Sequence, residues 1–413
     1  MGMIINIDQA LKLRTDYNIL REPLNDMLKN MQEAWERKNP IDLLFHRGTI
    51  STFQETYTSS IGFDHAFAET GDYQIGPIFN THEGFSATYR TRTFQGGFVI
   101  TQQTLEDRQL GRAKNDATQF TRRWHGDLVE YAITAISAGF GKTVTWGSSA
   151  NGGVTRLLLN SADTTDGDII TATKNPLFSK AHTIVKRNGM SADDITAALQ
   201  SNLFCVSDGA TTPTYGIDLA GTDDGKIGKL ADVINQVITV MENYRDDNGK
   251  RAGVLGAKTI VCGNDAHLKA ALKTAVSLDM FNGTLNPAFQ RATVEDSPYL
   301  LDIDQCKDGV GFFIVDRAYN AENHGPEFTE RVAFTLEVTP SNRPKGINYD
   351  GRQRFDINVA SWRGISYVYL GSTAPAWSEN GAITDFTAIV PNATLVKPVQ
   401  VIGTVSTKEV SAT

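Results

Sequence analysis

The feature that most constrains this chain of 413 residues is one long helical stretch, from Phe98 to Gly139. It contains no proline, and its only interior glycines are Gly111 and Gly126. Small and aromatic residues recur along it at steps of three and four, which places them on one face of a helix. These residues are Ala113, Ala117, Phe120, Trp124, Leu128, Tyr131 and Ala135. The spacing predicts a helix over 101–138, about 57 Å long, whose apolar stripe packs on strands formed later in the chain.

Both ends of this predicted helix carry ordinary boundary signals. Thr101 or Thr104 can cap its start, and Glu106 and Asp107 follow where the helix dipole favours negative charge. A glycine-rich turn that begins at Gly139 marks its end.

Residues 1–48 are predicted to form an arm. Pro23 opens an amphipathic helix with Trp35 on its apolar face, and Asn39 and Pro40 end it. One amphipathic helix cannot bury its apolar face alone. The arm must therefore lie on the body of the protein or on a neighbouring subunit.

Residues 49–100 are predicted to be extended. Phe85, Ala87 and Tyr89 alternate with polar residues, and a second strand follows that includes Phe98–Ile100. Glycines and prolines interrupt the segment, and it has few aliphatic residues. It cannot fold as a compact unit, so a long β-hairpin projecting from the body is expected.

The remainder of the chain mixes helices and strands and then turns to strands. Four features are predicted in the middle: a helix over 227–244, a buried strand at Lys258–Cys262, a helix capped by Asp265, and a central strand at Gly309–Val315. Long alternating strands follow over 327–370, and 371–413 is rich in Ser, Thr, Ala and Val with a last strand expected at Val399–Val405. The fold class predicted is α+β.

Composition excludes several classes of function. The net charge of −8 gives no basic footprint for nucleic acid and no polybasic membrane patch. No apolar run approaches the length of a membrane span, and no signal peptide precedes the first helix. The cysteines Cys205, Cys262 and Cys306 are scattered and odd in number, which favours buried thiols in a reducing compartment.

One motif suggests chemistry. Gly139–Thr143, with Lys142, resembles the end of a phosphate-binding loop. The first glycine of that loop is replaced by Ile136, and the motif follows a helix where the loop should follow a strand. A glycine-rich helix end is the favoured interpretation, and a phosphate-binding enzyme is a distant alternative.

The acidic residues and the histidines do not have the spacing that metal-binding sites require. The acidic residues Asp163, Asp166 and Asp168 lack the glutamate that completes a calcium loop. The seven histidines have no metal-binding spacing and no Cys–His cluster. The sequence therefore predicts no catalytic residue, no cofactor and no metal, and the chain is not expected to be an enzyme.

The order of the segments is more informative than any motif. Phe98-Val99-Ile100-Thr101 runs into Glu106-Asp107, and Pro176-Leu177-Phe178-Ser179 is followed by His182. With the arm, the hairpin, the long helix and the late strands, the chain resembles the major capsid proteins of tailed double-stranded-DNA bacteriophages, a fold shared with encapsulins. The resemblance in organisation covers roughly residues 1–370.

The resemblance implies a domain plan. It gives an N-terminal arm (1–48), an extended loop (49–97), a peripheral domain (98–200) with its spine helix over 101–138, an axial α/β domain (201–326), a return to the peripheral sheet (327–370) and a C-terminal extension (371–413). The arm and the extended loop would clasp neighbouring subunits. The candidate interface residues are Trp35, Tyr73, Phe79, Arg90, Arg92, Arg122 and Arg123.

The implied function is a shell of hexamers and pentamers, assembled in the bacterial cytoplasm, that encloses double-stranded DNA without sequence-specific binding. The implied partners are a separate scaffolding protein and a portal at one vertex, with decoration proteins left open. The extended loop has no lysine between Lys38 and Lys114. We therefore expect none of the lysine–asparagine cross-links of some relatives. Because the predicted arm begins almost at once after Met1, we also expect no maturation cleavage.

Two alternatives of other kinds remain. An encapsulin-type compartment shares the fold and would enclose an enzyme in place of DNA. A secreted calcium-dependent adhesin is disfavoured by the missing signal peptide and the lack of repeats.

Overall fold

The fold was analysed in a computed structural model. The structure describes residues 39–60, 70, 78, 83–103, 110–148, 153–157, 160–164, 174–182, 199–207, 216–217, 219, 224–246, 250–281, 283–342, 345–379, 381–384 and 386–391.

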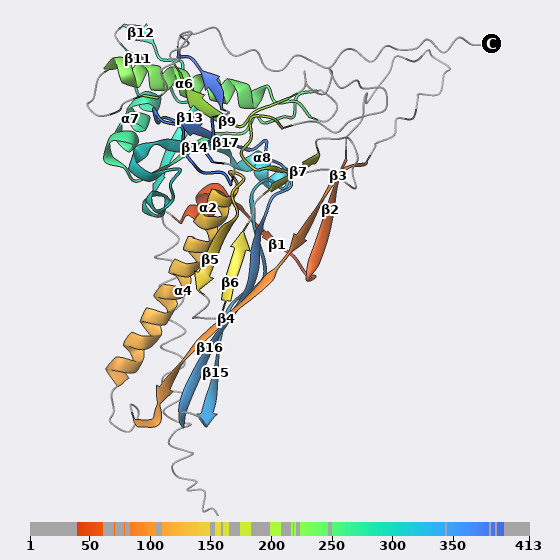
Figure 1. Ribbon diagram of the computed structural model, residues 1–413, viewed down its shortest axis with the longest axis vertical. Helices are drawn as coiled ribbons and strands as arrows, with labels where there is room; N and C mark the ends of the chain where they lie inside the picture. Colours follow the sequence, from red (N-terminus) through yellow and green to blue (C-terminus); the bar gives the residue numbers. More distant parts are fainter. Residues whose placement is uncertain are drawn as a thin grey trace, which may run out of the picture.

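A four-stranded sheet forms the elongated half of the molecule (Figure 1). Its strands lie in the order β1 (His46–Thr49), β15 (Glu327–Asn342), β16 (Lys345–Asn358) and β4 (Arg92–Thr101). β15 and β16 form one long antiparallel hairpin, β4 runs antiparallel to β16, and the short β1 runs parallel to the start of β15. Strands far apart in the sequence therefore make a long, narrow platform.

The long helix α4 (Leu110–Ala138) lies along this platform (Figure 1). Its 29 residues span about 43 Å. Thr101, one of the two predicted caps, is the last residue of β4 and pairs with Gly346, and the two residues that follow it, Gln102 and Gln103, are helical. One continuous helix over 101–138 stays a prediction. Thr104 lies outside the described residues.

A two-stranded hairpin leaves the platform. It consists of β2 (Gln54–Ser60) and the antiparallel β3 (Glu83–Arg90). The prediction of a hairpin in this segment is confirmed, but the strand that follows does not belong to it. β4 begins only one residue after β3 and pairs with β16.

A second, six-stranded sheet forms the other half of the molecule. Its strands lie in the order β13 (Ala292–Ser297), β10 (Lys258–Gly263), β14 (Gly311–Asp316), β17 (Ile365–Tyr369), β9 (Leu203–Val206) and β18 (Thr387–Ile389). Helices α6 (Asp224–Glu242) and α7 (Ala266–Ser277) lie in this half (Figure 1). Asp265 caps α7 as predicted, since its side chain accepts a hydrogen bond from the Leu268 amide.

One prediction for the late chain needs correction. Ile365–Tyr369 was expected in the sheet of 327–370, but β17 lies in the six-stranded sheet between β14 and β9. The alternation of a strand does not say which sheet it joins. β18 was not predicted, and the strand expected at Val399–Val405 lies outside the described residues.

Short elements complete the described part of the chain. They are α2 (Pro40–Leu44), β5 (Val144–Ser148), β6 (Gly153–Leu157), β7 (Asn160–Thr164), β8 (Lys174–Pro176), β11 (Met280–Phe281), β12 (Thr284–Leu285), α8 (Arg317–Glu322), and the 3-10 turns Pro298–Asp302 and Lys307–Gly309. Asn39 and Pro40 lie at the cap and the first position of α2.

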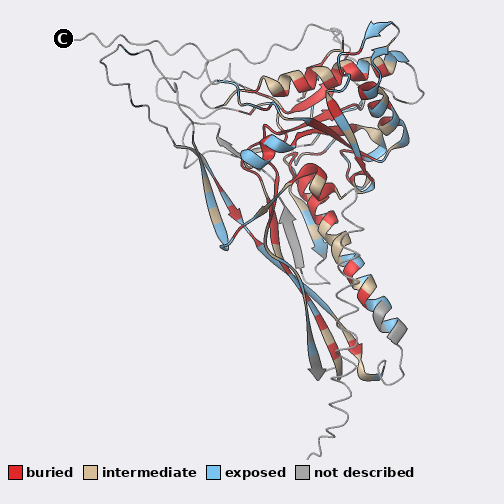
Figure 2. Ribbon diagram, turned by 180° about the vertical axis from the view of Figure 1, so that it is seen from behind, coloured by how far each residue is buried: buried red, intermediate tan, exposed pale blue. Residues whose placement is uncertain are grey.

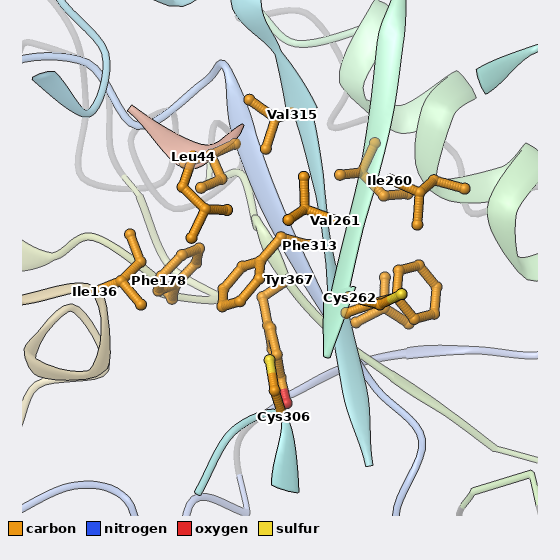
Figure 3. Packing of buried hydrophobic residues seen from close by; sticks show 14 of the residues in the cluster. Leu44, Ile136, Phe178, Ile260, Val261, Cys262, Cys306, Phe313, Val315 and Tyr367 are labelled. Carbon is orange, nitrogen blue, oxygen red and sulfur yellow. The ribbon is translucent and has the colours of Figure 1, made fainter. Parts of the chain in front are cut away.

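One apolar core joins the two halves. Ile136 of α4, Leu44 of α2 and Phe313 and Tyr367 of the six-stranded sheet meet around Phe178 (Figure 3). The buried positions concentrate in the six-stranded half and along one side of α4 (Figure 2). The predicted α+β class is confirmed.

The cysteines lie in or beside this core. All three are free and buried, as predicted. Burial raises the pKa of Cys205 to about 11 and that of Cys262 to about 12. Both thiols are therefore protonated and unreactive at neutral pH.

Candidate functional site

The apolar stripe of α4 faces the platform sheet. The Phe120 ring lies 5.1 Å from Phe98 of β4, and the Trp124 ring lies 4.8 Å from Phe334 of β15. Tyr131 lies 5.3 Å from Phe355 of β16, edge to face. The prediction that this stripe packs on the late strands is confirmed. These aromatic contacts, made between Phe120 and Tyr131, hold the middle of the helix and the sheet in one rigid frame.

A polar contact lies inside this apolar layer. The Tyr131 hydroxyl donates to Asp356 Oδ1 at 2.5 Å, and Arg92 Nε lies 2.8 Å from the other oxygen of that carboxylate. Burial raises the pKa of Asp356, and Arg92 opposes that shift. The carboxylate therefore ties the helix, through Tyr131, to the first residue of β4.

The hairpin meets the body at a small cluster that we call the hairpin root. Tyr57 and Tyr89 pack edge to face at 4.8 Å, and the Tyr89 hydroxyl donates to the His324 carbonyl at 3.3 Å. Ala87 and Ala360 fill the remaining space, each nearly inaccessible to solvent. Beyond this cluster, Arg90 and Arg354 both lie over the ring of Phe53.

His324 and its neighbour Glu327, whose Oε2 lies 3.2 Å from His324 Nδ1, also belong to the hairpin root but were not predicted. The sequence signal there is local: His324 sits between Asn323 and Gly325, a turn pattern after a short helix. Nothing in the spacing indicates that a hairpin formed more than two hundred residues earlier packs on this turn.

The candidate interface residues fall into three groups. Trp35, Tyr73 and Phe79 lie outside the described residues. Arg92 pairs with Asp356 of its own chain, although 44% of its side chain is exposed. Arg90, Arg122 and Arg123 are exposed.

The two arginines on α4 differ. Arg123 lies 2.7 Å from Asp127 and 3.5 Å from Glu130, both on its own helix. Arg122 makes no ion pair within the described part of the chain.

The glycine-rich turn after α4 is a helix end, as favoured from the sequence. The Gly139 amide donates to the Ile136 carbonyl at 3.0 Å, and Phe140 is buried against Phe178. The Thr143 amide donates to a carboxylate oxygen of Glu379 at 3.0 Å. A carboxylate at this amide repels a phosphate, so the turn is unsuited to cradle one.

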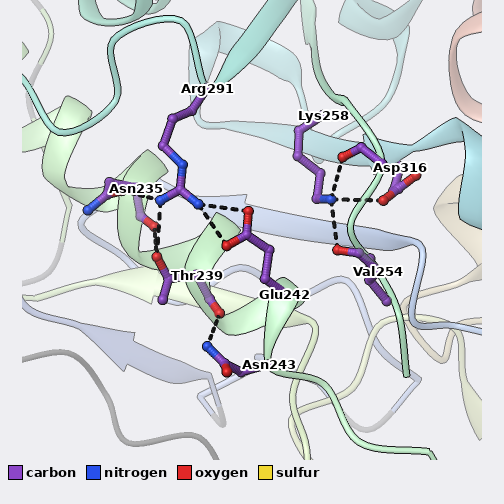
Figure 4. A network of polar contacts seen from close by, with 9 residues as sticks. Asn235, Thr239, Glu242, Asn243, Val254, Lys258, Arg291 and Asp316 are labelled. Carbon is purple, nitrogen blue, oxygen red and sulfur yellow. Dashed lines mark hydrogen bonds and ion pairs between the residues drawn. The ribbon is translucent and has the colours of Figure 1, made fainter. Parts of the chain in front are cut away.

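The most buried ion pair is structural. Lys258 Nζ lies 2.8 Å from Asp316 Oδ2 and also donates to the carbonyls of Val254 and Gly256 (Figure 4). The other Asp316 oxygen accepts from the Tyr319 amide and caps α8. All three lysine protons are therefore used within the protein, and none is left for a substrate.

Searches for other kinds of site gave no candidate. Across the described ranges, no group of three or more His, Cys, Asp or Glu side chains is arranged to hold a metal ion. No helix among the residues described is both long and apolar enough to span a membrane.

Comparison with known proteins gave matches among solved structures. No family model and no curated protein matches the chain. The similar structures include Mycobacterium phage Patience, with 12% identity, a TM-score of 0.41 and coverage of 90% of this chain and 92% of that one. The mature capsid of bacteriophage PhiM1 has 12% identity, a TM-score of 0.41 and coverage of 79% and 86%.

A virus-like particle from Pyrococcus furiosus is also similar, with 9% identity, a TM-score of 0.38 and coverage of 84% of this chain and 97% of that one. At TM-scores this low, the properties of a neighbour cannot be transferred to this chain.

Proposed function

We propose that the chain is the major capsid protein of a tailed double-stranded-DNA bacteriophage. Copies of it form hexamers and pentamers of an icosahedral shell that encloses the packaged genome, and it is not an enzyme. The observation that carries this proposal is the rigid frame of α4 on the platform sheet, from which the hairpin β2–β3 projects.

The projecting hairpin supports assembly in particular. An isolated two-stranded hairpin is only marginally stable in water. In the described part of the chain, β2 and β3 pair with each other and with no other strand. A neighbouring subunit that covers the hairpin supplies the missing contacts, so the extended loop acts as a clasp between subunits.

The charge of the chain also fits a shell around DNA. A net charge of −8 keeps the protein from binding phosphates tightly, so the genome can be packed and released. We expect a separate scaffolding protein, a portal at one vertex, a virion location, and no lysine–asparagine cross-link.

Electron microscopy of the expressed full-length chain, alone and with a co-expressed scaffolding protein, tests the proposal. Closed shells of uniform size are expected. Subunits that remain monomeric under both conditions would contradict it. Particles isolated from infected cells should contain DNA; an enzyme cargo would instead identify an encapsulin-type compartment.

The exposed arginines offer a sharper test of the interfaces. Because Arg122 has no ion pair in the described part of its own chain, we propose that it meets a carboxylate on a neighbour. Arg122→Ala should slow assembly without changing the melting temperature of the subunit. Arg123→Ala is the matched control, since that arginine is paired within its own helix, and it should assemble normally.

A further inference from the structure

The hairpin root contains a histidine in an uncommon backbone conformation. His324 follows the end of α8 with a φ of 49°. This is the left-handed position that commonly ends a helix, and glycine adopts it without steric cost. A histidine here carries that cost, so its side chain should supply something that glycine cannot.

The His324 ring contacts both strands of the hairpin. Its centroid lies 4.2 Å from that of Tyr57 on β2, at an interplanar angle of 31°. It also lies 6.1 Å from Tyr89 on β3, edge to face. The imidazole thus touches the hairpin at its root, and 39% of the His324 side chain remains exposed.

The same ring is tied to the platform sheet. His324 Nδ1 lies 3.2 Å from Oε2 of Glu327, the first residue of β15, whose side chain is only 5% exposed. Gly48 of β1 makes room for this carboxylate, since a Cβ on Gly48 would lie 1.5 Å from Glu327 Oε1. One histidine therefore bridges a buried carboxylate of the body and an aromatic ring of the hairpin.

Acidic and aromatic groups lie around the imidazole. Glu327 on β15 lies beside its Nδ1, and Tyr57 on β2 and Tyr89 on β3 contact its ring. Glu55 on β2 interacts with Tyr57, and His46 on β1 is the register partner of Glu327. Among the described residues, His324 is the one basic side chain within ion-pair distance of the Glu327 carboxylate. An imidazolium also gains from the face of a tyrosine ring, which attracts cations.

We propose that His324 is a proton-dependent latch for the hairpin β2–β3. Protonated, it pairs with Glu327 and presents its charge to Tyr57, and the hairpin root is held against the platform. Neutral, it loses the ion pair and the cation–π contact, and the root loosens while the hairpin itself stays paired. The latch acts within one chain, so it does not depend on what that chain assembles into.

Hydrogen–deuterium exchange of the unassembled full-length chain tests the latch. Protection of the β2 and β3 amides is measured from about pH 5 to about pH 8, the range in which histidine side chains change charge, with correction for intrinsic exchange. Protection should fall about threefold as the pH rises, the size expected for a half-exposed ion pair.

Variants separate the latch from general effects of pH. His324→Asn should abolish the pH dependence, because asparagine tolerates the left-handed backbone but does not titrate. Glu327→Gln should also abolish the pH dependence of protection, and this variant replaces His324→Asn if the latter does not fold. His46→Gln is the control and should keep the pH dependence of protection. Wild-type protection that does not change with pH, or an unchanged pH profile in a folded His324→Asn or Glu327→Gln, would overturn the proposal.

Discussion

Trp124 shows how a single side chain fixes the long helix to the platform. Its ring packs on Phe334 of β15, and its Nε1–H donates to Gln353 Oε1 of β16 at 2.9 Å. Gln353 is itself buried and donates onward to Glu330. Removing the indole would therefore leave both an aromatic gap and an unsatisfied amide.

Trp124→Ala should lower the free energy of unfolding by about 2 kcal/mol, less than the roughly 3–5 kcal/mol of a fully buried aromatic, because the Trp124 side chain is only partly buried. Trp124→Phe should cost about 1 kcal/mol, since it keeps the ring and loses the hydrogen bond. Urea denaturation of unassembled subunits measures both. Equal stability of Trp124→Ala and wild type would count against this packing.

The buried carboxylate Asp356 gives a dependence on pH with a definite sign. Its pKa is raised by burial above the ordinary value of 3.8. Its contribution to stability is therefore fully present below the unfolded-state pKa and is lost as the pH rises through the folded-state pKa. The stability of wild type relative to Asp356→Asn should accordingly fall as the pH rises above about 4.

Denaturation of wild type and Asp356→Asn across this pH range checks the Asp356 prediction. The effects of the other titrating groups cancel in the difference between the two free energies of unfolding. Asparagine can still accept the Tyr131 hydrogen bond. A relative stability that increases with pH would mean that the attraction of Arg92 outweighs burial.

At the scale of elements, periodicity predicted whether a segment forms a helix or a strand better than it predicted which sheet a strand joins. The stripe from Ala117 to Ala135 and the cap Asp265 were correct because helix spacing and capping are local. The same spacing did not indicate that Thr101 also ends β4, because its partner Gly346 lies more than two hundred residues later. The sheet of β17 was misassigned because hydrogen-bond partners distant in the chain leave no local trace.

Two glycines in the frame should respond to alanine in opposite directions. Gly126 lies in the middle of α4, and a Cβ there would meet nothing within 4 Å. Gly126→Ala should stabilise the unassembled subunit by about 0.5–1 kcal/mol through helix propensity. A Cβ on Gly346 would lie 2.1 Å from the Ile100 carbonyl oxygen, so Gly346→Ala should destabilise by about 1–3 kcal/mol.

Thermal melts of the two variants, compared with wild type, measure both changes in stability. If Gly126→Ala instead lowered the melting temperature, the helix would not be open to solvent at that position in the free subunit.

For the whole molecule, the hairpin β2–β3 should be separable from the fold. The Thr91 amide lies 3.3 Å from the Phe53 carbonyl oxygen, so the two ends of the hairpin are adjacent. Among the described residues, the buried apolar side chains of the hairpin belong to the small hairpin root, and the main core lies elsewhere. A projecting hairpin of this kind is typical of a segment that binds a neighbouring subunit.

Replacing residues 54–90 with a short glycine linker should therefore leave a folded subunit that cannot form shells. Circular dichroism and melting should stay close to wild type, and electron microscopy should show no particles. Normal shells from this variant would remove the hairpin from the assembly interface. Loss of folding would show that the hairpin is part of the core.

Strands β3 and β4 are separated by the single residue Thr91, so hairpin and platform share one nearly continuous ribbon. A pull on the hairpin then loads β4 lengthwise along β16. Every pair from Arg92–Phe355 to Thr101–Gly346 must slide together, and none can peel apart first. Hydrogen bonds resist such shear jointly, so the ribbon should behave as a tether of high mechanical strength although the hairpin it carries is marginal.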